Sequence, residues 1–120
     1  MGNSFKDLVV RQRAIQLSLA IYKLTSSFPD SERFGLTNQL RRASVSVASN
    51  IAEGYGKLSR GEYLLFLGHA RGSNFELQTQ LVIANGLGLG SAPARREAEG
   101  LSEEVSRMLV AIMNKLKKPA

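Results

Sequence analysis

The sequence predicts an all-α fold, an antiparallel up-down four-helix bundle formed by one domain that spans residues 1–120. Three observations lead to this prediction. Four segments carry apolar residues at helical spacing, and no segment alternates as a half-buried strand would. Short stretches rich in glycine, proline and polar residues separate them. A chain of 120 residues with 43% hydrophobic residues has the size and composition of one domain with one core.

The first predicted helix covers about residues 6–28 and carries two apolar stripes. One stripe consists of Leu8, Ile15, Leu19 and Tyr22, and the other of Val10, Ala14, Leu17, Ile21, Leu24 and Phe28. A helix needs one stripe to cover a core. We therefore expect part of this helix to face a second partner, either another helix of the bundle or another subunit. Pro29 ends the pattern, because a proline disfavours helical backbone at the residue before it.

The second predicted helix covers residues 36–54. Its periodic apolar positions are Leu36, Leu40, Ala43, Val47 and Ile51. Many of its other inward positions are alanine or serine, which let neighbouring backbones approach closely, so this helix should be central. Gly54 and Gly56 follow the pattern and can supply a helix cap.

The third predicted helix, residues 60–85, begins with a capping box from Ser59 to Glu62. Gly68 and Gly72 share one face and each lowers helix propensity by up to about 1 kcal/mol, which predicts that another helix presses against that face. The glycine-rich stretch 85–90 is predicted to be a loop. A dinucleotide-binding turn would need a strand before it and a helix directly after it, and the sequence offers neither.

The fourth predicted helix covers residues 94–117. It carries Leu101, Val105, Met108, Ile112 and Leu116 at helical spacing. Pro93 suits the first turn of a helix. Acidic residues occur early and lysines late, the order that the helix dipole favours.

Composition excludes several classes of site. The chain has no cysteine and one histidine, His69, which excludes disulfides, thiolate zinc sites and histidine-rich metal centres. Glu53, Glu62 and Glu76 could supply carboxylates, but no di-iron, phosphate-loop or nucleophile-elbow motif accompanies them. We therefore expect no catalytic residues, no metal site and no cofactor, and we expect that the protein is not an enzyme.

The chain carries 16 Lys/Arg against 10 Asp/Glu, a formal net charge of +6. This excess favours anionic partners, although it is spread over the chain. The polar N-terminal residues 1–7 lack the apolar run of a signal peptide, and no segment reaches the roughly 18 apolar residues that a membrane span needs. The expected location is the cytoplasm.

Arg41 and Arg42 interrupt a helix that is otherwise built of small and apolar residues. If the turn between the second and third helices centres near Lys57, Arg42 lies level with Gly72 and Ser73. Glu76 is then one turn away, within reach of either arginine.

One interpretation of these charges is structural. Arg41 or Arg42 would pair with Glu76, and Arg60 would pair with Glu53, holding the two helices together. The other interpretation is functional, with some of these cations free to contact phosphates. The candidates for such contacts are Arg41, Arg42, Lys57, Arg60 and Arg71. The sequence leaves both interpretations open.

Several motifs together resemble a known family. They are Phe5-x-Asp7-Leu8, Ile21-Tyr22-x-Leu24-Thr25, Gln39-Leu40-Arg41-Arg42-Ala43, Asn50-Ile51-Ala52-Glu53-Gly54, and the run from Phe66-Leu67 to Glu76-Leu77. Over roughly residues 5–90 the chain resembles the four-helix bundle proteins encoded in intervening sequences of 23S rRNA genes. Arg11 departs from the family, which often has an aromatic residue there.

The resemblance implies a homopentameric ring of bundles. Relatives of that family include the accessory protein of diversity-generating retroelements, a basic pentamer that binds nucleic acid and a reverse transcriptase. The expected function is therefore that of a non-enzymatic oligomeric nucleic-acid-binding or adaptor protein that contacts phosphates of RNA or DNA through Arg and Lys without base specificity. The alternative is a protein-interaction scaffold with an acidic protein partner and no nucleic-acid role.

Overall fold

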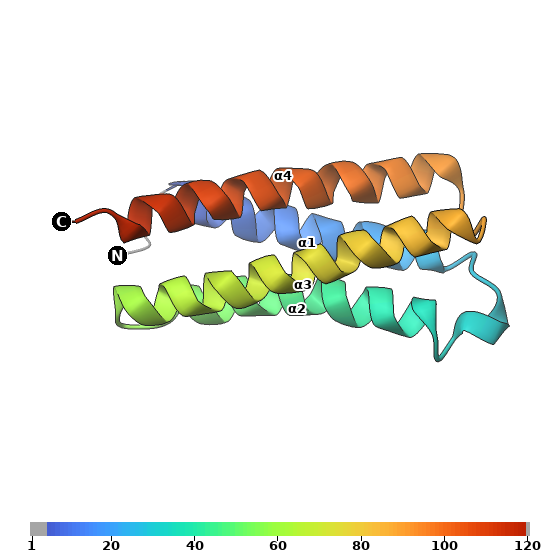
Figure 1. Cartoon of the computed structure of the whole chain (residues 1–120), viewed down its shortest axis with the longest axis horizontal. Helices are drawn as coiled ribbons and strands as arrows, with labels where there is room; N and C mark the ends of the chain where they lie inside the picture. Colours follow the sequence, from blue (N-terminus) through green and yellow to red (C-terminus); the bar gives the residue numbers. More distant parts are fainter. Residues whose placement is uncertain (1–4, 120) are drawn as a thin grey trace.

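The computed structural model describes residues 5–119 and consists of four long helices. These are α1 (Phe5–Thr25), α2 (Leu36–Tyr55), α3 (Arg60–Gly86) and α4 (Ala92–Lys117), with a short 3₁₀ helix, η1 (Asp30–Glu32), between α1 and α2. No strand occurs in the described part of the chain. Consecutive helices run in opposite directions, as the sequence predicted (Figure 1).

Each helix packs against two neighbours, so that α1 touches α2 and α4 while α3 touches the same two helices. The bundle is elongated, with extents of 50 × 23 × 18 Å. The start of α1 and the end of α4 lie at the same end of the bundle, together with the turn between α2 and α3 (Figure 1).

The two apolar stripes of α1 have different environments. The stripe from Val10 to Phe28 forms part of the core, and each of its six side chains is at most 9% exposed. The stripe of Leu8, Ile15, Leu19 and Tyr22 lies on the surface, with exposed fractions between 42% and 65%. Burying this second stripe on α1 would require a partner outside the single chain.

The C-terminal end of α1 differs from the prediction. The helix ends at Thr25, three residues before the predicted bound. The Thr25 hydroxyl donates to the Ile21 carbonyl at 2.8 Å and the Ser27 hydroxyl to the Leu24 carbonyl at 3.2 Å. Such side-chain bonds offer the backbone an alternative to continuing the helix, and Pro29 acts in the same direction.

Serine side chains cap the starts of α3 and α4. The Ser59 hydroxyl accepts from the Glu62 backbone N–H and donates to the Glu62 carboxylate, which confirms the predicted capping box. The Ser91 hydroxyl accepts from the Ala94 N–H, so α4 starts two residues earlier than predicted.

Glycines explain how closely α2 and α3 approach, but at a different place from the one predicted. A Cβ atom on Gly54 would lie 2.8 Å from the Phe66 Cβ, so α3 crosses directly over this position. The predicted close packing at Gly68 and Gly72 is wrong. A Cβ atom on Gly72 would meet nothing within 4 Å, and one on Gly68 would just touch Met113 at 4.0 Å.

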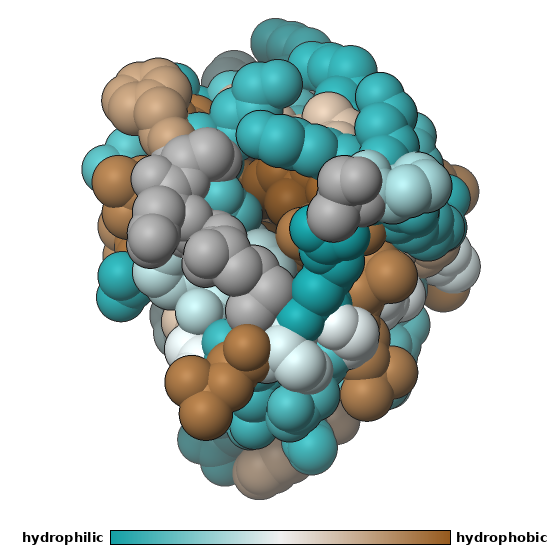
Figure 2. Space-filling view, turned by 90° about the vertical axis from the view of Figure 1, so that its left-hand side faces the viewer, coloured by the Kyte–Doolittle hydropathy of each residue, from teal (hydrophilic) through white to brown (hydrophobic). Residues whose placement is uncertain are grey.

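The end of the bundle that carries both termini is rimmed mainly by hydrophilic side chains, around a central depression where hydrophobic atoms are visible (Figure 2). The core therefore extends close to this end of the molecule.

Candidate nucleic-acid interface

The register between α2 and α3 is set by a hydrogen bond of 2.8 Å between the hydroxyls of Ser46 and Ser73. In an antiparallel pair this bond places Arg42 opposite Leu77. The sequence predicted that Arg42 lies level with Gly72 and Ser73, which are a few residues closer to the start of α3 than Leu77. Helical periodicity does not encode how far two helices slide past each other, so the turn-based estimate missed the offset.

Arg41 and Arg42 point to different sides of α2, because adjacent residues of an α-helix are about 100° apart. Arg41 faces α1, where its Nε donates to the Thr25 hydroxyl at 2.9 Å and its guanidinium lies 4.6 Å from the centroid of the Tyr22 ring. Arg42 is exposed and faces α3. The pair therefore reaches two separate neighbours of α2.

The ion pairs predicted from the sequence do not form. Within residues 5–119 no ion pair joins Arg41 or Arg42 to Glu76, although Arg42 and Glu76 line the same hollow. Arg41 contacts Thr25 and Tyr22 of α1 instead, because adjacent residues of α2 point about 100° apart and Arg41 faces α1.

Glu53 is also paired differently from the prediction. Its carboxylate lies 3.9 Å from Lys57 Nζ, one helical turn ahead. Arg60 reaches across the end of the bundle, where its Nη1 donates to the Lys118 carbonyl at 3.2 Å. The cation that compensates Glu53 therefore comes from the turn directly after α2 and not from α3.

The five candidate phosphate-binding residues do not form one cluster. The end of α2 at Tyr55 lies about 20 Å along the helix axis from Arg42, at 1.5 Å per residue, and Lys57 and Arg60 follow it. Arg71 lies two positions before Ser73 and so about 200° around α3 from the side that faces α2. The guanidinium of Arg71 is 4.9 Å from the centroid of the Phe75 ring.

A polar hollow of about 330 Å³ lies between α2 and α3. Its polar lining includes Asn38, Gln39 and Arg42 from α2 and Ser73, Glu76 and Gln80 from α3. A second hollow of about 610 Å³ shares Asn38, Arg42 and Ser46 with the first and continues to Arg41, Val45 and Tyr22. We call the two hollows together the arginine groove, because Arg42 lies in both.

Sequence reasoning missed Gln80. It is 7% exposed, and within the described chain its side-chain carbonyl oxygen has no hydrogen-bond partner. A buried polar atom without a partner is unusual in folded proteins. The available signal was the position of Gln80, three residues after Leu77 and four before Ala84, which places it on the same side of the helix as these two apolar residues.

Sequence reasoning also underestimated the exposed aromatic residues. Phe5 is 77% exposed and Phe75 also lies on the surface, although neither was singled out from the sequence as a candidate contact. The guanidinium of Arg33 lies 4.9 Å from the centroid of the neighbouring Phe34 ring. Arg33–Phe34, Arg41–Tyr22 and Arg71–Phe75 thus form three surface pairs of arginine and aromatic ring.

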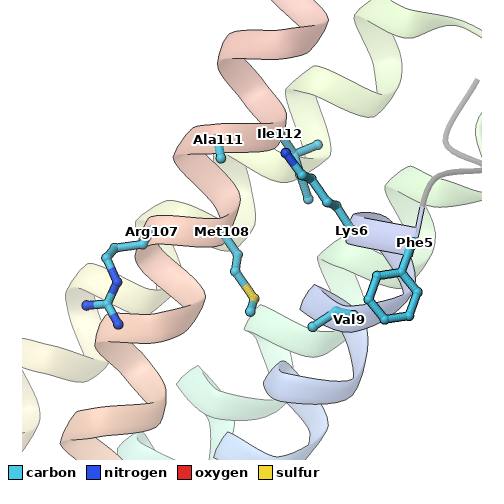
Figure 3. A pocket seen from close by; sticks show the side chains of 7 residues that line it. All are labelled: Phe5, Lys6, Val9, Arg107, Met108, Ala111 and Ile112. Carbon is cyan, nitrogen blue, oxygen red and sulfur yellow. The ribbon is translucent and has the colours of Figure 1, made fainter.

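An apolar hollow of about 320 Å³ lies between the start of α1 and the second half of α4. Figure 3 shows Val9, Met108 and Ile112 around it, with the Phe5 ring at one side. Lys6 and Arg107 contribute cationic side chains to its lining. Farther along the same seam, Arg13 Nε lies 2.7 Å from Glu104 and Lys23 Nζ lies 3.5 Å from Glu97.

Most of the cations lack an acidic partner. The chain has 16 Lys/Arg, all within the described residues, and four of them form ion pairs: Arg13, Lys23, Lys57 and Arg95. The remaining 12 have no carboxylate within 4.0 Å in the described structure. Twelve cations are therefore free of direct ion pairs in the described residues, while the chain as a whole carries a formal net charge of +6.

Two of the acidic residues form hydrogen bonds within the fold. Asp7 is buried and accepts a hydrogen bond from the Tyr63 hydroxyl, while the Glu32 carboxylate accepts from the Leu36 N–H at 3.1 Å. Burial raises the pKa of Tyr63 above its ordinary value, and the hydrogen bond to Asp7 raises it further. These acids stabilise the fold and do not neutralise the surface cations.

Residues 5–119 contain no group of three or more His, Asp or Glu side chains arranged to hold a metal ion. Among the helices described, none is both long enough and apolar enough to cross a membrane.

Comparison with known proteins gives a family match and a structural match. A family model described as "23S rRNA-intervening sequence protein" matches residues 6–111. A crystal structure of a protein of unknown function from the S23 ribosomal protein family of Bacteroides thetaiotaomicron superposes with a TM-score of 0.81. It is 21% identical in sequence, and the match covers 92% of this chain and 99% of that one. A search of curated proteins gives no match.

Proposed function

Since the chain belongs to the family of 23S rRNA-intervening sequence proteins, we propose that it is a non-enzymatic, oligomeric protein that binds the phosphate backbone of nucleic acids. The observation that carries this proposal is the set of 12 lysines and arginines that have no ion pair within residues 5–119. Such cations gain most from an anionic polymer, because each phosphate contact releases counterions into solution.

The arginine groove is the proposed place of contact. Arg41 and Arg42 lie there with Asn38 at the surface, and Tyr22 offers a partly exposed aromatic ring. Grooves that combine cations with aromatic rings suit nucleic acid, because the cations bind phosphates and the rings stack on bases. Lys57, Arg60 and Arg71 would add contacts elsewhere on the surface, not within this groove.

The oligomer is proposed to form through the exposed stripe of α1. Leu8, Ile15 and Leu19 extend along one side of the helix, while Tyr22 at the end of the stripe borders the arginine groove. A row of exposed apolar side chains of this kind is typical of a surface that is buried in an assembly. A homopentameric ring, as the sequence resemblance implies, would repeat the arginine groove around the assembly and add the fields of its subunits.

Binding to labelled duplex DNA, single-stranded DNA and structured RNA, followed by fluorescence anisotropy over a salt series, tests the proposal. We expect the logarithm of the binding constant to fall linearly with the logarithm of salt concentration, with a slope of about 0.9 per phosphate contact for duplex DNA. The double variant Arg41→Gln/Arg42→Gln should lower that slope by one to two contacts.

The matched control is Arg96→Gln/Lys117→Gln, which removes the same charge from exposed residues outside the arginine groove. It should change the slope less than the groove variant does. Thermal unfolding of both variants separates lost binding from lost folding. If the intact oligomer binds none of the three probes at low salt, the nucleic-acid proposal is wrong.

The hollow between α1 and α4 favours the second candidate function, a protein-interaction scaffold. Its lining is almost entirely apolar except for Lys6 and Arg107. That combination fits an apolar side chain flanked by acidic residues on a partner protein, because the two cations complement the acids. Absence of nucleic-acid binding from an intact oligomer would favour this candidate.

A further inference from the structure

The polar hollow between α2 and α3 contains hydrogen-bonding groups that the chain leaves unused. Gln80 is more than nine-tenths buried and lines the hollow, and its side-chain oxygen has no hydrogen-bond partner within residues 5–119. This oxygen is itself inaccessible to solvent. A ligand in the hollow would therefore meet the exposed side chains of Arg42 and Glu76.

Arg42 and Glu76 face the same hollow and carry opposite charges, yet no ion pair joins them and neither has another ion-pair partner in residues 5–119. The hollow therefore presents donors from Arg42 on one side and acceptors from Glu76 on the other. A ligand that fits must carry acceptors along one edge and several donors along another.

Hydrogen bonds fix part of the lining of the hollow. Ser46 and Ser73 join their hydroxyls at 2.8 Å, and Asn50 Nδ2 donates to the Ser46 carbonyl at 2.9 Å and to its hydroxyl at 3.1 Å. The volume of about 330 Å³ lies at the lower end of the range of small-molecule pockets, roughly 300–1,000 Å³. This size and polarity suit a planar polar ring.

We propose that this hollow binds one unpaired guanine base of a single-stranded nucleic acid, an inference that rests on the proposed nucleic-acid function. Guanine carries acceptors at O6 and N7, which an arginine contacts with two parallel hydrogen bonds. It carries donors at N1 and at the 2-amino group on its Watson–Crick edge. Arg42 would bind O6 and N7, while the two carboxylate oxygens of Glu76 would accept from N1–H and from the amino group.

Adenine fits the same groups less well. It has an acceptor at N7 but an amino donor at position 6 in place of the guanine oxygen, so Arg42 would lose one of its two bonds. Adenine also lacks the N1 proton that Glu76 would accept. The charges of the hollow therefore select guanine over adenine.

The second hollow of the arginine groove has room for the nucleotide next to the bound base. Arg42 borders both hollows, and beyond it the guanidinium of Arg41 lies over the Tyr22 ring. A base can stack on an arginine plane as on an aromatic ring. The protein would recognise one unpaired guanine in this way, while its contacts to phosphates would not depend on the nucleotide sequence.

The test uses uridine-rich 12-nucleotide RNA strands that carry one central guanine, adenine or inosine, together with the thymidine-rich DNA strands of the same design. Affinities are measured by fluorescence anisotropy at one salt concentration. We expect guanine to bind about 5- to 150-fold more tightly than adenine, the range for one well-placed bidentate contact. Inosine lacks the 2-amino group and should fall between them. Comparison of the RNA and DNA strands shows whether the hollow prefers a guanine of RNA or of DNA.

Glu76→Gln should remove most of the preference for guanine over inosine, because the variant no longer presents two acceptor oxygens. The matched control is Glu103→Gln, which neutralises an exposed acid on α4, outside the arginine groove and without an ion pair in the described structure. The control should keep the full preference.

A second variant keeps the inference testable if Glu76→Gln fails to fold. Arg42→Gln should bind strands with guanine and with 7-deazaguanine equally, because the contact to N7 is lost. Equal wild-type affinity for guanine and adenine, or an unchanged guanine preference in folded Glu76→Gln, would overturn the inference. Those results leave the proposed function intact, which fails separately if no strand binds at all.

Discussion

The contact between Tyr63 and Asp7 ties α3 to the start of α1. Both side chains are buried, and the tyrosine hydroxyl donates to the carboxylate. Neither residue was singled out as a partner of the other from the sequence, because 56 positions separate them. Helical periodicity identifies inward positions, but it does not identify which polar side chains meet there.

Stability should fall at alkaline pH because of Tyr63. Burial and the hydrogen bond to Asp7 raise the folded-state pKa of Tyr63 above its ordinary value of 10.0. Above pH 10 the unfolded chain loses this proton while the folded protein retains it, so the free energy of unfolding decreases as the pH rises. Urea unfolding followed by circular dichroism between pH 7 and 11 measures this decrease.

Tyr63→Phe is the variant that isolates the effect. It should lower stability by about 1–3 kcal/mol at pH 7, because the buried Asp7 loses a hydrogen bond, and it should show a weaker decrease above pH 10. Tyr22→Phe changes a partly exposed tyrosine and serves as the control. An identical pH profile for wild type and Tyr63→Phe would contradict this account.

Gly54 shows why α2 and α3 form the closest pair of helices. Its missing side chain leaves space for the Phe66 Cβ and the Tyr63 ring. From the sequence, Gly54 was expected to end the helix, whereas α2 continues to Tyr55 and is capped at Gly56. A glycine near a helix end has two possible roles, and a single sequence does not separate them.

Gly54→Ala should therefore destabilise the protein by about 1–3 kcal/mol, the usual cost of inserting atoms into a well-packed contact. Gly72→Ala is the control, since an added Cβ there meets nothing within 4 Å. That variant should gain up to about 1 kcal/mol from helix propensity. Chemical denaturation of the two variants compares them, and equal effects of the same sign would show that α3 does not press on Gly54.

The helices themselves could be predicted because their periodicity and caps are local signals. Their predicted bounds lie within three residues of the observed ones. The charged contacts could not be predicted in the same way, since they depend on the offset between helices. Glu53 pairs with Lys57 on its own turn, and Arg41 binds Thr25 of α1. Adjacent residues of an α-helix point about 100° apart, so the sequence alone could have shown that Arg41 and Arg42 would not both face Glu76.

The exposed stripe of α1 connects the single chain to its proposed assembly. Its positions were predicted from the sequence as a second apolar stripe, and the structure places them outside the core. The number of subunits depends on the angle at which two copies meet, which spacing along one helix does not encode. The exposed stripe could therefore be predicted from the sequence, whereas the number of subunits in the ring could not.

Leu19→Glu should lower the molecular mass in solution, because Leu19 is the most exposed member of the stripe, at 65%, and a charge there would be buried in the assembly. Val82→Glu is the matched control on α3, outside the stripe at 72% exposure. Light scattering of both variants at several concentrations gives the mass. An unchanged oligomer in Leu19→Glu would mean that assembly uses another surface.

The order of helices around the bundle also bears on how the chain folds in time. Three of the four helix contacts join segments that are consecutive in sequence, and the fourth joins α1 to α4. Closing that last contact brings together residues as distant as Arg13 and Glu104, 91 positions apart. Because distant contacts require closure of a long loop, we expect the three local hairpins to form early and the α1–α4 seam to close last.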